Sequence, residues 1–310
     1  MKLNRLNSIM TKSVAAIAAC AALNATAGTA PAPQSPAPVE PAPTALFDSI
    51  GATLDVGYDS RYYYRGLWFA DNIVWSAVNV AVPLIGGSGE DGGSLTLGLG
   101  ATYISTVETP FGNPPSSNGF DYSEIDLLAS LTYDAGFAKF GVQYLHYFYP
   151  DTYAGSFNGA ANGITDPEFS IKGAGEVGFT ITVPLQALNL YFGYYYDFRV
   201  SGSYFQAAAD YTIPVTDWLS IVPAIQTGYG IDYYTGNGSA LTNNVGLPLA
   251  GAPTSGFTHL LVSVGTPIKL TKIATLTPYV AWNHSFDLRT ALNFTTHNEV
   301  FGGVKLSLAF

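Results

Sequence analysis

The chain ends with a strictly alternating stretch, FGGVKLSLAF, at residues 301–310. Successive side chains of a β-strand point to opposite faces of the sheet. One face of this stretch therefore carries Val304, Leu306, Leu308 and Phe310, and the other carries Lys305, Ser307 and Ala309. Chain ends are usually frayed and polar, so the pattern predicts a strand that is paired to its last residue. Its apolar face must be shielded from water, either by lipid or by the core of a soluble protein. Which of the two shields it distinguishes a membrane fold from a soluble one.

The composition indicates that lipid shields the apolar face. Only 11% of the residues are charged, whereas 14% are aromatic, with 21 Tyr and 18 Phe. After the first 27 residues, no run of apolar residues is long enough to form a spanning helix, which needs about 20 of them. The closed β-barrel is the other structure that satisfies its backbone polar groups inside a membrane. A soluble β-sandwich is the rival, since its strands alternate in the same way.

Twelve segments show the two-residue period of strands, and most approach the ~9–11 residues of a membrane-spanning strand. They cover residues 50–65, 73–84, 95–101, 124–132, 139–144, 169–183, 188–199, 205–213, 219–232, 259–268, 274–286 and 304–310. Connections after the even-numbered segments are short, whereas four of those after the odd-numbered segments are long. Short periplasmic turns that alternate with longer outer loops are typical of bacterial outer-membrane barrels. The predicted fold class is therefore all-β, a closed antiparallel transmembrane β-barrel of about 12 strands with both termini in the periplasm.

The first residues have the features of an export signal. A basic start and a short apolar core precede Ala25-Thr26-Ala27, a typical cleavage site. We expect a signal peptide at 1–27, a disordered Pro/Ala-rich leader at 28–46 and an outer-membrane β-barrel at 47–310. An alternative interpretation is a lipoprotein signal with Cys20, the one cysteine, lipidated.

Charge disfavours a nucleic-acid partner. Cleavage after residue 27 would leave 9 of the 12 basic residues against 22 acidic ones, and nucleic-acid binding needs a basic footprint. The charged side chains lie on the parity opposite the apolar one, which places them on the barrel's inner face. Arg or Lys facing lipid at mid-membrane would cost about 2–4 kcal/mol. The predicted lumen-lining residues are Asp55, Asp59, Arg61, Arg65, Glu124, Asp126, Lys139, Lys172, Glu176, Asp197, Arg199, Asp210, Asp232 and Lys305.

Aromatic residues gather near the predicted strand ends, where a membrane-interface belt is expected. The expected outer belt contains Tyr62–Tyr64, Trp68, Tyr147–Tyr149, Tyr194–Tyr196, Tyr229 and Tyr233, and the periplasmic belt contains Phe137, Trp218 and Phe310.

Two stretches carry a family resemblance. The segment at 53–84, which contains Tyr62-Tyr63-Tyr64-Arg65-Gly66, resembles the opening of the TorF-like porins, where a strand ends in a Tyr-x-x-Arg-Gly element. The segment at 123–152 resembles the acidic-aliphatic strand of that family and the Tyr-rich strand after it, which ends here in Tyr149-Pro150. The resemblance implies an outer-membrane channel and brings no catalytic residue and no defined substrate.

These patterns predict a porin-like channel, not an enzyme, through which small hydrophilic solutes or ions diffuse along a narrow and mildly acidic lumen. In the alternative, charges pair across the lumen, as Arg61 or Arg65 with Asp59, and leave a plugged barrel that displays its loops. A third hypothesis, a hydrolase with His259 and Ser263, is disfavoured because residues four apart on one strand are ~13 Å apart. The histidines 259, 284 and 297 could instead gather on a metal.

We expect no cofactor and no metal. The expected partners are outer-membrane lipid and the barrel-assembly machinery, which would recognise the terminal strand through Val304, Leu306, Leu308 and Phe310. The transported solute and the oligomeric state are left open.

Overall fold

The computed structural model describes residues 51–86, 93–107, 123–148, 174–198, 201–233, 255–286 and 298–310, and these residues form one antiparallel β-sheet. The expected signal peptide and leader lie outside the described residues. Across the described ranges, no helix has the length and apolar character to cross a membrane.

Twelve of the fourteen strands in the described part are long, and β9 and β12 contain two residues each. The strands are β1 (Gly51–Tyr64), β2 (Leu67–Ile85), β3 (Ser94–Thr106), β4 (Ser123–Asp134), β5 (Lys139–Phe148), β6 (Ala174–Leu185), β7 (Leu188–Asp197), β8 (Gly202–Tyr211), β9 (Ile213–Pro214), β10 (Ser220–Ile231), β11 (Ser255–Gly265), β12 (Ile268–Lys269), β13 (Ala274–Ser285) and β14 (Asn298–Ala309).

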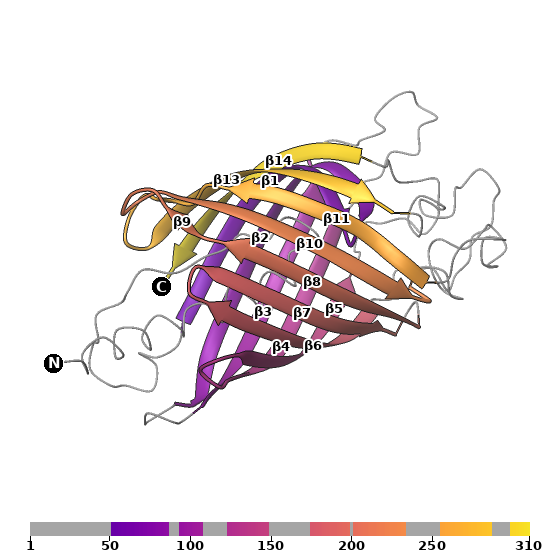
Figure 1. Cartoon of the computed structure of the whole chain (residues 1–310), viewed down its shortest axis with the longest axis horizontal. Coiled ribbons are helices and arrows are strands. Elements are labelled where there is room, and N and C mark those ends of the chain that lie inside the picture. Colours follow the sequence, from indigo (N-terminus) through magenta and orange to yellow (C-terminus); the bar gives the residue numbers. More distant parts are fainter. Residues whose placement is uncertain are drawn as a thin grey trace.

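The long strands close into a barrel (Figure 1). Consecutive long strands pair antiparallel from β1 to β14, and β14 returns to β1 over Thr53–Asp59. The backbone amide of Phe310 donates to the carbonyl of Ala52, so the chain is paired to its last residue. The sheet therefore has no free long edge, and the predicted closed barrel of twelve spanning strands is confirmed.

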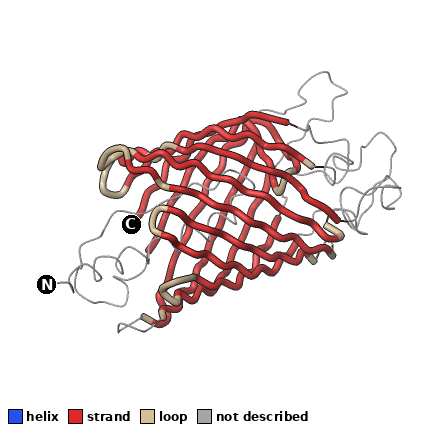
Figure 2. Tube along the Cα trace, viewed as in Figure 1, coloured by secondary structure: helices blue, strands red, loops and turns tan. Residues whose placement is uncertain are grey.

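The two ends of the barrel differ (Figure 2). At one end, which we call the turn end, β4–β5 and β6–β7 are joined by the short segments 135–138 and 186–187. At the other, which we call the loop end, β5–β6 and β10–β11 are separated in sequence by residues 149–173 and 232–254. The carboxyl terminus lies at the turn end. This asymmetry is the one expected from the spacing of the strands in the sequence.

The outer face of the barrel is a continuous apolar surface. Alternation places one row of large apolar residues of each strand outside, where they are exposed in the isolated chain. They include Val56, Val78, Leu99, Leu127, Val142, Phe179, Phe192, Ile225 and Val280. A soluble protein does not expose apolar surface on this scale, whereas a membrane-spanning barrel needs such a band. The alternation in the terminal stretch is thus explained by lipid contact.

The aromatic residues divide between the belt and the interior. Phe137, Trp218 and Phe310 are exposed at the turn end, as expected for interface residues. Several of those predicted for the outer belt are not at the surface. Tyr62, Tyr63, Tyr147, Tyr195 and Tyr233 are all buried, so their assignment to the belt was wrong. They gather inside the barrel near the loop end.

The phase of the strands is testable with two adjacent residues near the middle of β6. Phe179 is 43% exposed on the outer face, and Thr180 lies on the inner face beside Gly141. We expect Phe179→Arg to lower the free energy of unfolding in lipid vesicles by about 2–4 kcal/mol, because the new charge would face acyl chains. Thr180→Arg is the matched control and should cost clearly less. Equal losses, or a larger loss for Thr180→Arg, would contradict the assignment of the two faces.

Candidate functional site

The hairpin between β1 and β2 does not stay in the barrel wall. We call residues Tyr62–Leu67 the hairpin tip. The turn residues Arg65 and Gly66 both have positive φ angles, 49° and 83°, as a tight two-residue hairpin turn requires. The pairing of β1 with β2 also shifts register between Tyr62 and Tyr63. Such a bulge re-aims the side chains that follow it, and here it turns the tip into the lumen.

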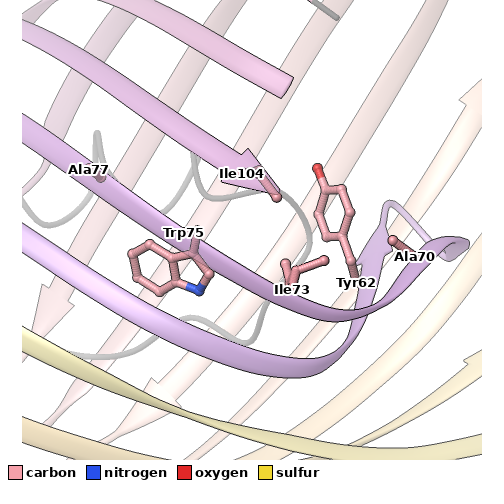
Figure 3. Packing of buried hydrophobic residues seen from close by; sticks show 6 residues of the cluster. All are labelled: Tyr62, Ala70, Ile73, Trp75, Ala77 and Ile104. Carbon is pink, nitrogen blue, oxygen red and sulfur yellow. The ribbon is translucent and has the colours of Figure 1, made fainter. Parts of the chain in front are cut away.

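One side of the hairpin tip contacts the inner face of β3, β4 and β5. The Tyr62 hydroxyl donates to Oε2 of Glu124 at 3.0 Å, and its ring packs with Ile73 and Ile104 (Figure 3). The hydroxyl oxygens of Tyr64 and Tyr147 lie 2.5 Å apart. The rings of the two residues pack edge to face. The two hydroxyl contacts join residues 62 and 83 positions apart in the chain.

The other side of the hairpin tip contacts β11, β13 and β14. Tyr63 packs in a buried cluster with Leu261, Ala281 and Phe301. The Ser285 hydroxyl donates to the backbone carbonyl of Gly66 at 2.9 Å. A side chain at Gly66 would lie 2.6 Å from Cβ of His259, so this turn fits against the wall only as glycine.

Arg65 reaches the part of the wall formed by β6, β7, β8 and the end of β10. Its guanidinium donates to both carboxylate oxygens of Glu176, at 2.5 and 2.8 Å, and to the hydroxyl of Tyr233. It also lies over the rings of Tyr195 and Tyr204. A guanidinium is charged at any physiological pH. Its bidentate pair with a carboxylate, through two parallel hydrogen bonds, is the strongest form of an arginine–carboxylate contact. The hairpin tip therefore crosses the lumen and is tied to its far side.

Inner-face side chains are buried around the hairpin tip, and their burial is mixed towards the turn end. Near the loop end, Glu124, Asp126 and Glu176 are at most 2% exposed. Towards the turn end on the same strands, Thr132 and Thr180 are only half-buried. Thr96, Lys139 and Asp210, which also lie towards the turn end, are buried. The hairpin tip therefore fills the lumen near the loop end, while the turn end contains both buried and half-buried polar side chains.

The sequence-predicted lumen residues that the structure describes divide into three groups. The acidic and basic side chains that are buried on the inner face are Asp55, Asp59, Arg65, Glu124, Asp126, Lys139, Glu176, Asp197 and Asp210. Arg61 and Lys305 are half-buried. Asp232 differs from the prediction, because it follows the end of β10 with a φ of 51° and is exposed there, outside the alternation that was used to place it. Lys172 and Arg199 lie outside the described residues.

Several of these charges have partners that explain their burial. Asp59 accepts from Nε1 of Trp75 at 2.8 Å and from the Tyr279 hydroxyl. Asn189 donates to Asp210 at 2.9 Å. Lys139 lies 3.8 Å from Asp134. Buried polar groups are normally paired in this way.

The ion pairs near the loop end differ from the pairing with Asp59 suggested by the sequence. Arg65 pairs with Glu176, and Arg61 pairs with Glu299 at 2.7 Å and approaches Asp71 at 3.6 Å. The long sequence separation of Arg65 and Glu176 leaves no local signal for their pairing. The sequence did contain one indication that this hairpin enters the lumen, the run of three tyrosines before Arg65-Gly66. Three consecutive large rings on one strand cannot all face lipid.

The histidines do not form a shared centre in the described residues. His259 is buried on the inner face, with Thr258 Oγ1 2.9 Å from its Nδ1. His284 lies opposite Leu260, on the other face, and contacts Asn298. Position 297 lies outside the described residues. No cluster of three or more potential metal-binding side chains occurs in the described ranges.

Comparison with known proteins gives distant likenesses only. No protein-family model matches this sequence, and no match to a curated protein was found. Among solved structures, an outer-membrane channel from Pseudomonas putida F1 is similar with a TM-score of 0.47 and 10% identity, over 84% of this chain and 94% of that one. The KdgM porin is similar with a TM-score of 0.40 and 8% identity, over 83% and 98%. Outer membrane phospholipase A from Escherichia coli is similar with a TM-score of 0.41 and 13% identity, over 83% and 92%.

These likenesses are too distant to assign a function. What defines the class of this protein is its own geometry, a closed twelve-stranded barrel with an apolar outer face and a polar inner face. The resemblance to TorF-like porins stays a prediction.

Proposed function

We propose that this protein is a narrow channel of the bacterial outer membrane, through which small polar solutes and ions diffuse. In this proposal the turn end and both termini face the periplasm, the apolar outer face contacts lipid, and the barrel-assembly machinery recognises the terminal strand. The observation that carries it is the hairpin tip. It narrows a lumen lined by polar and charged side chains with a single hairpin turn.

The inner face supports passage of cations rather than anions. Acidic side chains outnumber basic ones among its buried charges, and Lys139 and Arg65 each lie next to a carboxylate. Rings of acidic side chains favour cations in pores.

A plugged, non-conducting barrel is the second candidate. It is favoured by the number of contacts that hold the hairpin tip against β4, β6, β11 and β13. In that case the protein would act through its loops, which lie mostly outside the described residues.

Single-channel recording in planar lipid bilayers separates the two candidates. The channel predicts discrete conductance steps and, under a potassium chloride gradient, a reversal potential of the sign given by cation preference. Bilayers that receive the same detergent without protein are the control. A correctly folded protein that gives no steps would overturn the channel and leave the plugged barrel.

A further inference from the structure

Arg65 occupies a receptacle that the barrel wall builds around it. Four tyrosine rings surround its guanidinium, with centroids 4.3 Å (Tyr204), 4.7 Å (Tyr195), 4.8 Å (Tyr64) and 5.2 Å (Tyr233) away. The carboxylate of Glu176 binds it through two hydrogen bonds. Tyr64 comes from the hairpin tip itself, whereas Glu176 and the other three rings come from the wall.

The wall side of this receptacle is packed independently of the arginine. The rings of Tyr195 and Tyr204 lie 6.2 Å apart, and those of Tyr204 and Tyr233 lie 5.4 Å apart. Glycines make space for the rings, since a side chain at Gly193 would meet Tyr195 at 2.5 Å and one at Gly228 would meet Tyr204 at 2.1 Å. The rings and the carboxylate therefore stand on three neighbouring strands, with Tyr233 directly after a fourth.

This combination of groups recognises one class of ligand. Aromatic faces attract cations, and guanidinium and alkylammonium groups bind best when several rings enclose them. A carboxylate at one side adds a charge-assisted, two-point contact that suits a guanidinium in particular. Sodium or potassium ions match such a site poorly, because a small hydrated cation gains little from ring faces.

We propose that this receptacle, formed by Glu176, Tyr195, Tyr204 and Tyr233, is a binding site for solutes that carry a guanidinium or alkylammonium group, and that Arg65 is its built-in occupant. A cation that enters the lumen competes with Arg65 for the site and releases the hairpin tip. Binding of the cation at the receptacle does not require that the barrel conducts. The claim that this binding opens the lumen rests on the proposed channel function. Because Arg65 is tethered next to the site, its effective concentration is high, so free cations bind the wild type weakly.

The first test empties the site. In detergent micelles, Arg65→Ala protein is titrated with methylguanidinium chloride at low millimolar concentration, and its thermal midpoint and tyrosine absorbance are followed. Sodium chloride at equal ionic strength is the reference. We expect a saturable rise of the midpoint with methylguanidinium and none with sodium. Binding to the wild type should be at least about tenfold weaker, because Arg65 competes.

Two variants show whether the response belongs to this receptacle. Arg65→Ala with Glu176→Gln removes the anchoring carboxylate and should lose most of the response. Arg61→Ala removes the other tip-proximal arginine, which pairs with Glu299 outside the receptacle, and should respond as the wild type does. A folded Arg65→Ala protein that does not respond, or equal responses in all variants, would overturn the proposal.

A second measurement covers the case in which Arg65→Ala does not fold. A Leu67→Cys protein in a Cys20→Ser background keeps Arg65, and its labelling by a membrane-impermeant maleimide reports release of the hairpin tip. We expect methylguanidinium to accelerate this labelling and sodium not to. If the labelling rate stays constant at every methylguanidinium concentration up to the solubility limit, then the solute does not compete with Arg65 and the proposal is overturned. If the barrel binds methylguanidinium but never conducts, then the channel function is refuted and the binding site is retained. If the barrel conducts but does not bind methylguanidinium, then the binding site is refuted and the channel function is retained.

Discussion

Replacing Arg65 with alanine is expected to lower the free energy of unfolding by about 3–5 kcal/mol, because it leaves the buried Glu176 carboxylate without its counter-ion. Glu176 is 1% exposed and receives two hydrogen bonds from Arg65. Urea unfolding in lipid vesicles, followed by tryptophan fluorescence, measures the loss. The pairs of Arg61 with Asp71 and Glu299, and of Lys139 with Asp134, are all more exposed.

The double variant Arg65→Ala, Glu176→Gln completes the cycle. It removes both charges, so it should recover a large part of the stability lost in the single variant. Arg61→Ala is the matched control. Its pair with Glu299 is partly exposed, and its loss should cost about 0–1 kcal/mol. Equal losses for Arg61→Ala and Arg65→Ala, or no recovery in the double variant, would show that Arg65 is not held as described.

Truncating the side chains that cross the lumen is expected to raise conductance several-fold. The triple variant Tyr62→Ala, Tyr64→Ala, Arg65→Ala removes the contacts to Glu124, Tyr147 and Glu176. The lumen should widen near the loop end, since these three side chains fill that part of it. Single-channel recording in planar bilayers is the measurement.

A second triple variant controls for the general effect of alanine substitution. Tyr144→Ala, Phe179→Ala and Phe192→Ala change three large side chains on the outer face. Conductance of this control should stay at the wild-type level. If the tip variant conducts no better than the control, then the hairpin tip is not the constriction.

The sequence predicted the wall well and the interior less well, for physical reasons. A wall residue has one of two environments, lipid or lumen, and the period of two reports which one it takes. The alternation of Leu127, Ala129 and Leu131 with Asp126 and Ser130 is of this kind, and burial follows it. Strand phase could therefore be predicted from local residues alone.

The hairpin tip could not be predicted in the same way. The register shift after Tyr62 breaks the alternation, and a bulge has no reliable local sequence signal. Tyr62 and Tyr64 were therefore assigned to the outer aromatic belt, although both side chains make their contacts inside the barrel. Ile73 and Trp75 are apolar and buried on the inner face because the tip packs near them. A pattern that compares only polar and apolar residues cannot anticipate a second layer inside the barrel.

The position of the hairpin tip inside the lumen is the claim on which the account depends, and cysteine labelling tests it most directly. In a Cys20→Ser background, Leu67→Cys places the probe in the tip, where the native side chain is 4% exposed, and Val107→Cys places it just after β3, where the native side chain is 56% exposed. With a membrane-impermeant maleimide, we predict that the cysteine at position 67 reacts slower than that at position 107 by about a hundredfold or more, as for a group exposed only by local opening. Equal rates of reaction in the folded protein would contradict the account.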